Sequence, residues 1–107
     1  MKEDDKEESL KYYKMSADHD CIEAMNTYAS FKRQGKICKA DKEESLKYYK
    51  MAADKGDADA MMKYALMCDI GNGVAVNKEE AMKYFKLAAE NGNEKAQEMQ
   101  SKKKNYI

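Results

Sequence analysis

The chain has 107 residues, of which 43% are hydrophobic and 37% charged, with nine methionines and no proline. Such a chain has room for one mainly helical domain, or for a few units of a helical repeat solenoid. Because 20 Lys and Arg residues balance 20 Asp and Glu residues, the net charge is zero and provides no field that attracts nucleic acid or an anionic membrane surface. We therefore expect no nucleic-acid partner.

The cysteines and the hydropathy of the chain indicate in which cellular compartment the protein resides. The three cysteines, Cys21, Cys38 and Cys68, are an odd number without paired spacing, which argues against a disulfide framework and favours a reducing compartment. The first nine residues, MKEDDKEES, contain no apolar stretch after Met1, and no later run approaches the roughly 20 apolar residues that span a bilayer. The sequence thus predicts a cytoplasmic protein without membrane insertion.

A repeated block defines the organisation of the chain. The sequence DKEESLKYYKM stands at residues 5–15 and again, letter for letter, at 41–51, and the variant NKEEAMKYFKL occupies 77–87. The copies therefore follow one another at a constant spacing of 36 residues. A constant period of this length is typical of solenoids built from stacked helical units. We expect one domain over residues 1–107, with units beginning near residues 6, 42 and 78.

Six helices are predicted in chain order, forming three hairpins. Apolar residues recur at spacings of three and four, as in amphipathic helices. Asp5, Asp41 and Asn77 each stand three residues before a glutamate and are the expected N-caps of three helices, while Gly56 and Gly92 are expected to close two of them. The last helix is mostly polar, as the cap of a solenoid should be. The predicted helices are 6–19, 22–34, 42–55, 58–70, 78–91 and 94–104.

The segment from residue 60 to residue 92 carries a spaced pattern of small, glycine and aromatic residues. Its members are Ala60, Ala65, Gly71, Gly73, Val74, Ala81, Tyr84, Phe85, Ala88, Ala89 and Gly92. With the 36-residue period, this pattern closely resembles the Sel1-like repeat (SLR), a relative of the tetratricopeptide repeat (TPR). The resemblance implies an all-α fold, a right-handed α–α superhelix of about three antiparallel helix pairs, TPR-like in architecture.

The resemblance also implies a function, that of a protein-interaction scaffold or adaptor. Two alternatives stay open: a structural spacer inside a larger adaptor, and a hydrolase like the penicillin-binding, cysteine-rich relatives. The chain lacks the cysteine pair in each repeat that marks those relatives, which argues against the hydrolase. The array starts on the second helix of a unit, so either the chain is a piece of a longer array or another molecule covers its first face. Self-association through this uncapped N-terminal end is one form of the second possibility.

If the curvature is that of TPR arrays, the first helix of each hairpin lines a concave groove that binds a partner segment. The predicted protein-binding residues on this face are Asn26, Ser30, Arg33, Asp59, Met62, Leu66, Asp69 and Ile70. Met62 and Leu66 are apolar at positions expected to face outward, as a binding surface would have them. The alternative is that they contact a neighbouring helix or are singly exposed.

No catalytic, cofactor or metal site is predicted. His19 is the only histidine, and neither it nor the three cysteines match a catalytic or zinc-ligand pattern. The aromatic pairs, such as Tyr12 with Tyr13, could stack on nucleic-acid bases. Their recurrence at one place in every block instead favours a role as bulky core residues.

Overall fold

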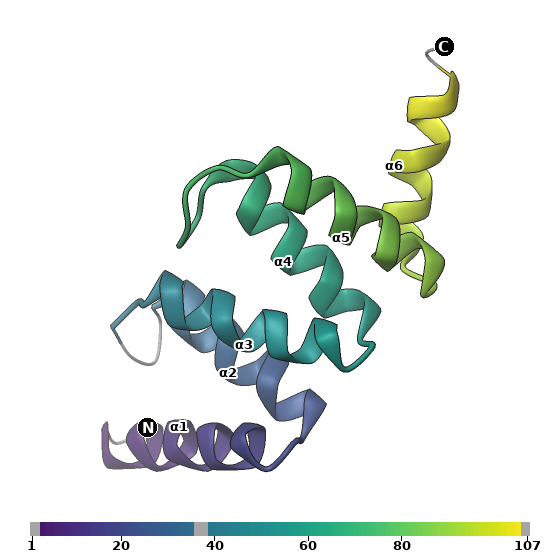
Figure 1. The fold of residues 1–107 in the computed structure, drawn as a ribbon. Coiled ribbons are helices and arrows are strands. Elements are labelled where there is room, and N and C mark those ends of the chain that lie inside the picture. Colours follow the sequence, from purple (N-terminus) through teal and green to yellow (C-terminus); the bar gives the residue numbers. More distant parts are fainter. Residues whose placement is uncertain (1–2, 36–38, 106–107) are drawn as a thin grey trace.

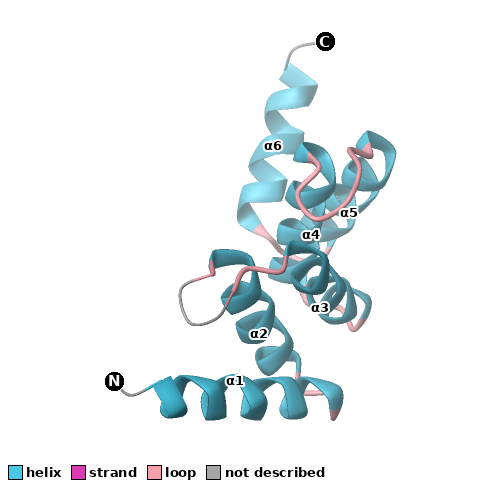
Figure 2. Ribbon diagram, turned by 90° about the vertical axis from the view of Figure 1, so that its left-hand side faces the viewer, coloured by secondary structure: helices cyan, strands magenta, loops and turns pink. Residues whose placement is uncertain are grey.

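The structure is a computed structural model that describes residues 3–35 and 39–105. These residues form helices and loops without a strand, so the all-α prediction is confirmed (Figures 1 and 2). The helices stack into an elongated body of 54 × 24 × 21 Å, and each packs mainly on its neighbours in the chain. The helices are α1 (Glu3–Asp18), α2 (Ile22–Gln34), α3 (Lys42–Asp54), α4 (Ala58–Ile70), α5 (Lys78–Glu90) and α6 (Glu94–Asn105).

Side-chain caps begin two of the three helices for which the sequence predicts an N-cap. The Asp41 carboxylate accepts a hydrogen bond from the Glu44 amide at 3.0 Å, and Asn77 Oδ1 accepts one from the Glu80 amide at 3.0 Å. These bonds satisfy amides that have no partner inside the helix. Asp5 is different, because α1 already begins at Glu3. The expectation that Asp5 is an N-cap is therefore wrong: the acidic residues before it suit a first helical turn, and the helix extends through them.

Alanines and tyrosines build the core between successive helices. The rings of Tyr28 and Tyr48 pack edge to face with centroids 4.7 Å apart, and those of Tyr64 and Tyr84 repeat this pair at 4.6 Å. Small residues beside these rings let the helix axes approach closely. The buried alanines are Ala17, Ala24, Ala29, Ala52, Ala53, Ala60, Ala65, Ala81, Ala88, Ala89 and Ala96.

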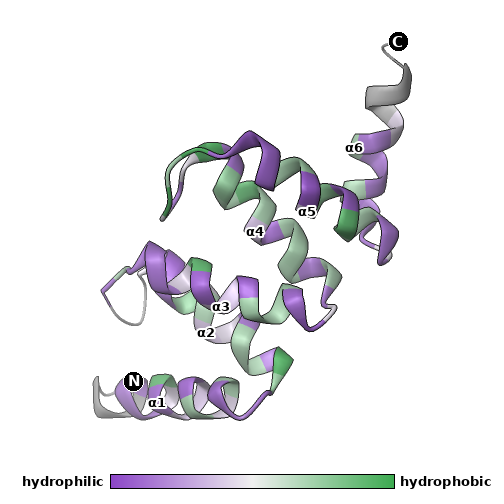
Figure 3. Ribbon diagram, viewed as in Figure 1, coloured by the Kyte–Doolittle hydropathy of each residue, from purple (hydrophilic) through white to green (hydrophobic). Residues whose placement is uncertain are grey.

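The two ends of the stack differ from its centre. Apolar residues are dense on α4, whereas α6 is mostly hydrophilic and buries Ala96 against the array (Figure 3). At the other end, Tyr12 on α1 is 64% exposed. The expectation that every aromatic pair lies in the core is thus wrong for Tyr12, since no described residue covers that side of α1.

Candidate protein-binding surface

Hydrogen bonds near the helix starts place α2, α4 and α6 next to one another. Asn26 on α2 donates from Nδ2 to the carboxylate of Asp57, the residue that caps α4, at 3.1 Å. The Asn93 side chain donates in turn to Asp59 on α4 at 3.0 Å, just before α6 begins. These bonds link α2, α4 and the start of α6, and the predicted binding residues all stand on α2 and α4.

The exposed arc of α4 is narrow and partly apolar. Asp59, Lys63, Leu66 and Ile70 are its exposed residues that recur at spacings of three and four, which places them on one side of the helix. Leu66 is 42% exposed and Ile70 is 67% exposed, one turn apart. We call these two residues the α4 patch. The larger apolar residues around it on α4 are buried, so the patch is the exposed apolar part of this helix.

Met62 does not belong to this arc, and the prediction that it faces outward is wrong. It is only 7% exposed and belongs to the core cluster. Successive helix residues turn by about 100°, so an error of one residue in the phase moves a side chain from the solvent to a neighbouring helix. Lys63 holds the outward position instead. Its charge, within the apolar run of α4, was the sequence signal for the solvent side.

Several of the other predicted residues already have partners within the fold. Asp59 binds Asn93, as described above, and Asp69 forms an ion pair with Lys78 at 2.8 Å. Ser30 is half-buried, and its hydroxyl accepts a hydrogen bond from the Gln34 amide at 2.9 Å. Arg33 is exposed at the end of α2. Leu66 and Ile70 are thus the apolar part of the predicted site that faces solvent.

Asn26 contributes a buried polar atom to the same surface. Its Nδ2 donates to Asp57 and, at 3.3 Å, to the carbonyl of Ile22. Its Oδ1 is buried without a hydrogen-bond partner among the described residues. Asn26 occupies the position that Met62 has one unit later, and both side chains are at least half-buried. Asn26 and Met62 therefore pack within the fold of their two units and are not available to a partner.

The residues considered for catalysis and for metal binding have the following surroundings. His19 is exposed at the end of α1, with Nδ1 2.8 Å from the carbonyl of Met15. Burial raises the pKa of the Cys68 thiol, which disfavours a reactive thiolate. No group of three or more histidine, cysteine or acidic residues is close enough to hold a metal in the described ranges. Cys38 lies outside the described residues.

Residues 3–35 and 39–105 also contain no helix that is both long enough and apolar enough to cross a bilayer.

This stack of helix pairs, repeated every 36 residues, defines an α–α helical repeat protein. The family model of the Sel1 repeat matches residues 1–21, 22–57 and 58–93, and the chain belongs to that family. The matched units begin at α2 and α4, which shifts the frame but keeps the period of the predicted units. Sel1 repeats are generally protein-interaction modules and typically non-catalytic scaffolds.

Solved structures share this fold. Helicobacter pylori cysteine rich protein B superposes with a TM-score of 0.83 at 24% identity over 88% of this chain and 71% of its own length. A Sel1 repeat protein from Oxalobacter formigenes gives 0.76 at 32% identity, covering 85% of this chain and 37% of its own. A protective antigen present in uropathogenic Escherichia coli strains, displaying an SLR fold, gives 0.78 at 26% identity, covering 81% of this chain and 19% of its own. No curated protein matches the sequence.

Proposed function

We propose that this chain is a protein-interaction scaffold that binds a segment of a partner protein. The segment lies along the solvent-facing side of α2 and α4, where the concave groove is expected. The observation that carries this proposal is the α4 patch, in which Leu66 and Ile70 expose apolar surface one turn apart on a helix whose other large apolar residues are buried. Exposed apolar pairs within a polar rim are a common centre of protein interfaces.

Charged residues lie on both helices of the proposed site. Arg33 extends from the end of α2, whereas Asp59 and Lys63 lie on α4 on the N-terminal side of the patch. Charges of both signs at the rim favour a partner with apolar residues flanked by mixed charges over a purely acidic or basic segment. The scaffold does no chemistry of its own in this proposal, and it acts in the cytoplasm, consistent with the free thiols of Cys21 and Cys68.

The test places a photo-crosslinking amino acid at Ile70 and, in a second variant, at Met82. Met82 is the matched control, because it is a 56% exposed apolar residue on a different helix, α5. We expect irradiation in a lysate of the source cells to yield a defined adduct from position 70 and none from position 82. Mass spectrometry of the adduct then identifies the partner segment.

Lysine substitutions, added to the chain with the crosslinker at position 70, decide whether the patch itself binds. Leu66→Lys should abolish the adduct formed from position 70, whereas Met82→Lys should leave it unchanged, with circular dichroism showing equal helicity in both. If Leu66→Lys leaves the adduct intact, or if position 70 yields no adduct, the groove assignment fails and the structural spacer becomes the better explanation.

A further inference from the structure

Two identical stretches of sequence have different surroundings in this fold. Residues 5–15 in α1 and residues 41–51 in α3 have the same letters. In α3, Ser45 is fully buried and Tyr48 is 2% exposed, but the equivalent Ser9 and Tyr12 in α1 are exposed. Because the letters are the same, the difference must come from what packs against each helix.

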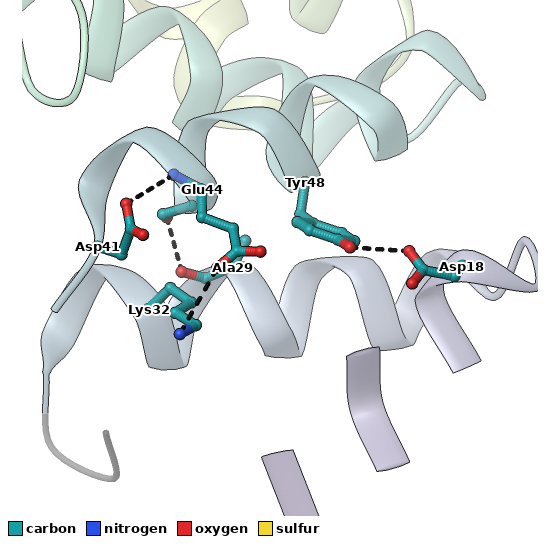
Figure 4. A network of polar contacts seen from close by, with 7 residues as sticks. Asp18, Ala29, Lys32, Asp41, Glu44 and Tyr48 are labelled. Carbon is teal, nitrogen blue, oxygen red and sulfur yellow. Dashed lines mark hydrogen bonds and ion pairs between the residues drawn. The ribbon is translucent and has the colours of Figure 1, made fainter. Parts of the chain in front are cut away.

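The preceding helix in the chain, α2, covers this face of α3. The Ser45 hydroxyl donates to the carbonyl of Ala29 at 2.6 Å, and the Tyr48 ring packs edge to face on Tyr28. A third contact is the ion pair of Lys32 with Glu44 at 3.5 Å (Figure 4). The next unit repeats the arrangement, since α4 covers the same face of α5 and pairs Tyr64 with Tyr84.

The adjoining face of α1 is packed as the array requires. Tyr13 stacks edge to face on Phe31 of α2 with centroids 5.5 Å apart, and Ala17 is fully buried. Their equivalents in α3, Tyr49 and Ala53, are buried too. Helix α1 is therefore a regular member of the stack with one of its two packing faces uncovered. A shallow hollow on α1 is lined by Glu8, Ser9, Tyr12 and Tyr13.

We propose that the uncovered face of α1, formed by Glu8, Ser9 and Tyr12, docks an amphipathic helix of a partner protein that carries the α2 pattern Ala-Met-x-x-Tyr-Ala-x-x-Lys. Each recognition element is taken from the α2–α3 interface. The tyrosine of the partner packs edge to face on Tyr12. The carbonyl of the alanine that follows this tyrosine accepts a hydrogen bond from the Ser9 hydroxyl. The lysine pairs with Glu8. This surface is separate from the α4 patch and does not depend on it.

A second copy of this chain is a poor occupant for the α1 face. The helix at the far end, α6, stands one unit after α4 and would be the helix that a head-to-tail copy presents. At the positions of Met25, Tyr28 and Ala29 it has Gln97, Gln100 and Ser101. It therefore lacks the tyrosine ring and the apolar residues that cover α3. The missing chemistry argues against a second copy as the source of the docked helix.

The probe is a fluorescent peptide with the sequence of residues 21–35, with Cys21→Ser, titrated against the full chain by anisotropy. We expect saturable binding that Tyr12→Lys weakens by at least about tenfold, a loss of about 1.4 kcal/mol. A peptide carrying Tyr28→Lys should bind as weakly. Met82→Lys, which alters an exposed apolar residue far from α1, is the matched control and should bind normally. Binding that survives Tyr12→Lys would overturn the proposal, because the peptide would then be docking elsewhere.

Fusing the copied helix to the chain tests the same contact without the low helicity of a short peptide, which would weaken its binding. Residues 21–40 are placed directly before Asp5, in place of residues 1–4, so that the copied helix runs into the same block that follows it naturally. We expect a higher urea midpoint than for the natural chain. The same extension with the copied Tyr28 and Ala29 changed to lysine should give no increase.

Equal midpoints for the extension and its lysine control would contradict the proposal. Sedimentation of the natural chain tests whether a second copy of the chain occupies the α1 face. Self-association that Tyr12→Lys abolishes would show that the face binds a second copy, and would overturn the assignment to a different protein. A monomer at all concentrations is the expected result.

Discussion

Tyr84 donates its hydroxyl hydrogen to the Asp54 carboxylate at 2.9 Å, across 30 residues of sequence. Tyr48 makes the equivalent bond to Asp18 at 2.8 Å (Figure 4). In each case a phenol in the second helix of one unit reaches the end of the second helix of the unit before it. These bonds therefore join successive repeats, while the ring of the same tyrosine packs inside its own hairpin.

Removing the Tyr84 hydroxyl should destabilise the fold. We expect Tyr84→Phe to lower the free energy of unfolding by about 1 to 2 kcal/mol, since a hydrogen bond to a charged group is lost while the exposed Asp54 regains water. Urea denaturation followed by circular dichroism measures the change. An unchanged urea midpoint would mean that the bond contributes nothing to the stability of the array.

Tyr49→Phe should have the opposite effect, although Tyr49 is also a core tyrosine. Its ring is fully buried, and its hydroxyl has no hydrogen-bond partner among the described residues. Phe85 stands at the same position one unit later. We expect the substitution to raise the free energy of unfolding by up to about 1 kcal/mol, because a buried unpaired polar group costs stability. The same urea series serves as the measurement, and a clear loss of stability would contradict this prediction.

Alkaline pH should weaken the fold through the tyrosines. Burial, followed by the hydrogen bond to Asp54, raises the pKa of Tyr84 from 10.0 to about 12. Burial is also the main cause of the raised pKa values of Tyr48 and Tyr64. A folded-state pKa above the unfolded value gives stability that is complete below about pH 10 and is lost as pH rises through about 12.

Urea denaturation between pH 8 and pH 12 tests whether stability falls as the pH rises. We expect the free energy of unfolding to fall above about pH 10, and to fall less steeply in Tyr84→Phe, which has one fewer raised phenol. Equal slopes in the two proteins would show that Tyr84 does not contribute. Absorbance at 295 nm, which follows phenolate formation, gives an independent record of the same titration.

The repeat and its helices were readable from the sequence because their signals are local. A cap such as Asp41 or Asn77 needs only the residues of the first turn, and the 36-residue period is visible in the letters. The surroundings of a helix face are not local. Tyr12 and Tyr48 lie in identical blocks, yet only Tyr48 is covered, so no pattern within the block could distinguish them.

The binding surface was predicted less well for the same kind of reason. Helix α4 is apolar on most sides, because both α3 and α5 pack against it, and its hydrophobic pattern therefore defines the phase weakly. That weak pattern predicts that Met62 faces solvent, which is wrong. The charged Lys63 next to it marks the solvent side, and the exposed Leu66 and Ile70 follow it at helical spacing.

A pair of alanine substitutions checks this corrected phase. Met62→Ala should lower the free energy of unfolding by about 2 to 3 kcal/mol, because it leaves a cavity in the core. Leu66→Ala should cost less than about 1 kcal/mol, since Leu66 is 42% exposed. Urea denaturation of both variants makes the comparison. Equal losses would mean that the two residues are buried alike and that the α4 patch is smaller than described.

Gly73 is the point where the loop between α4 and α5 touches the start of α3. Its φ of 86° is left-handed, and an added Cβ would lie only 2.7 Å from the Lys42 carbonyl carbon. We expect Gly73→Ala to destabilise the chain by about 3 kcal/mol or more, because rigid backbone atoms would have to move apart in addition to the unfavourable φ.

Gly56→Ala is the matched control for Gly73→Ala. Gly56 has a φ of 99°, but an added Cβ would meet nothing within 4 Å. Its substitution should therefore cost only the backbone strain, about 1 to 2 kcal/mol. The difference between the two urea midpoints isolates the steric contact between adjacent repeats. If the two variants lose the same stability, the close approach of the loop to Lys42 does not hold these repeats in place.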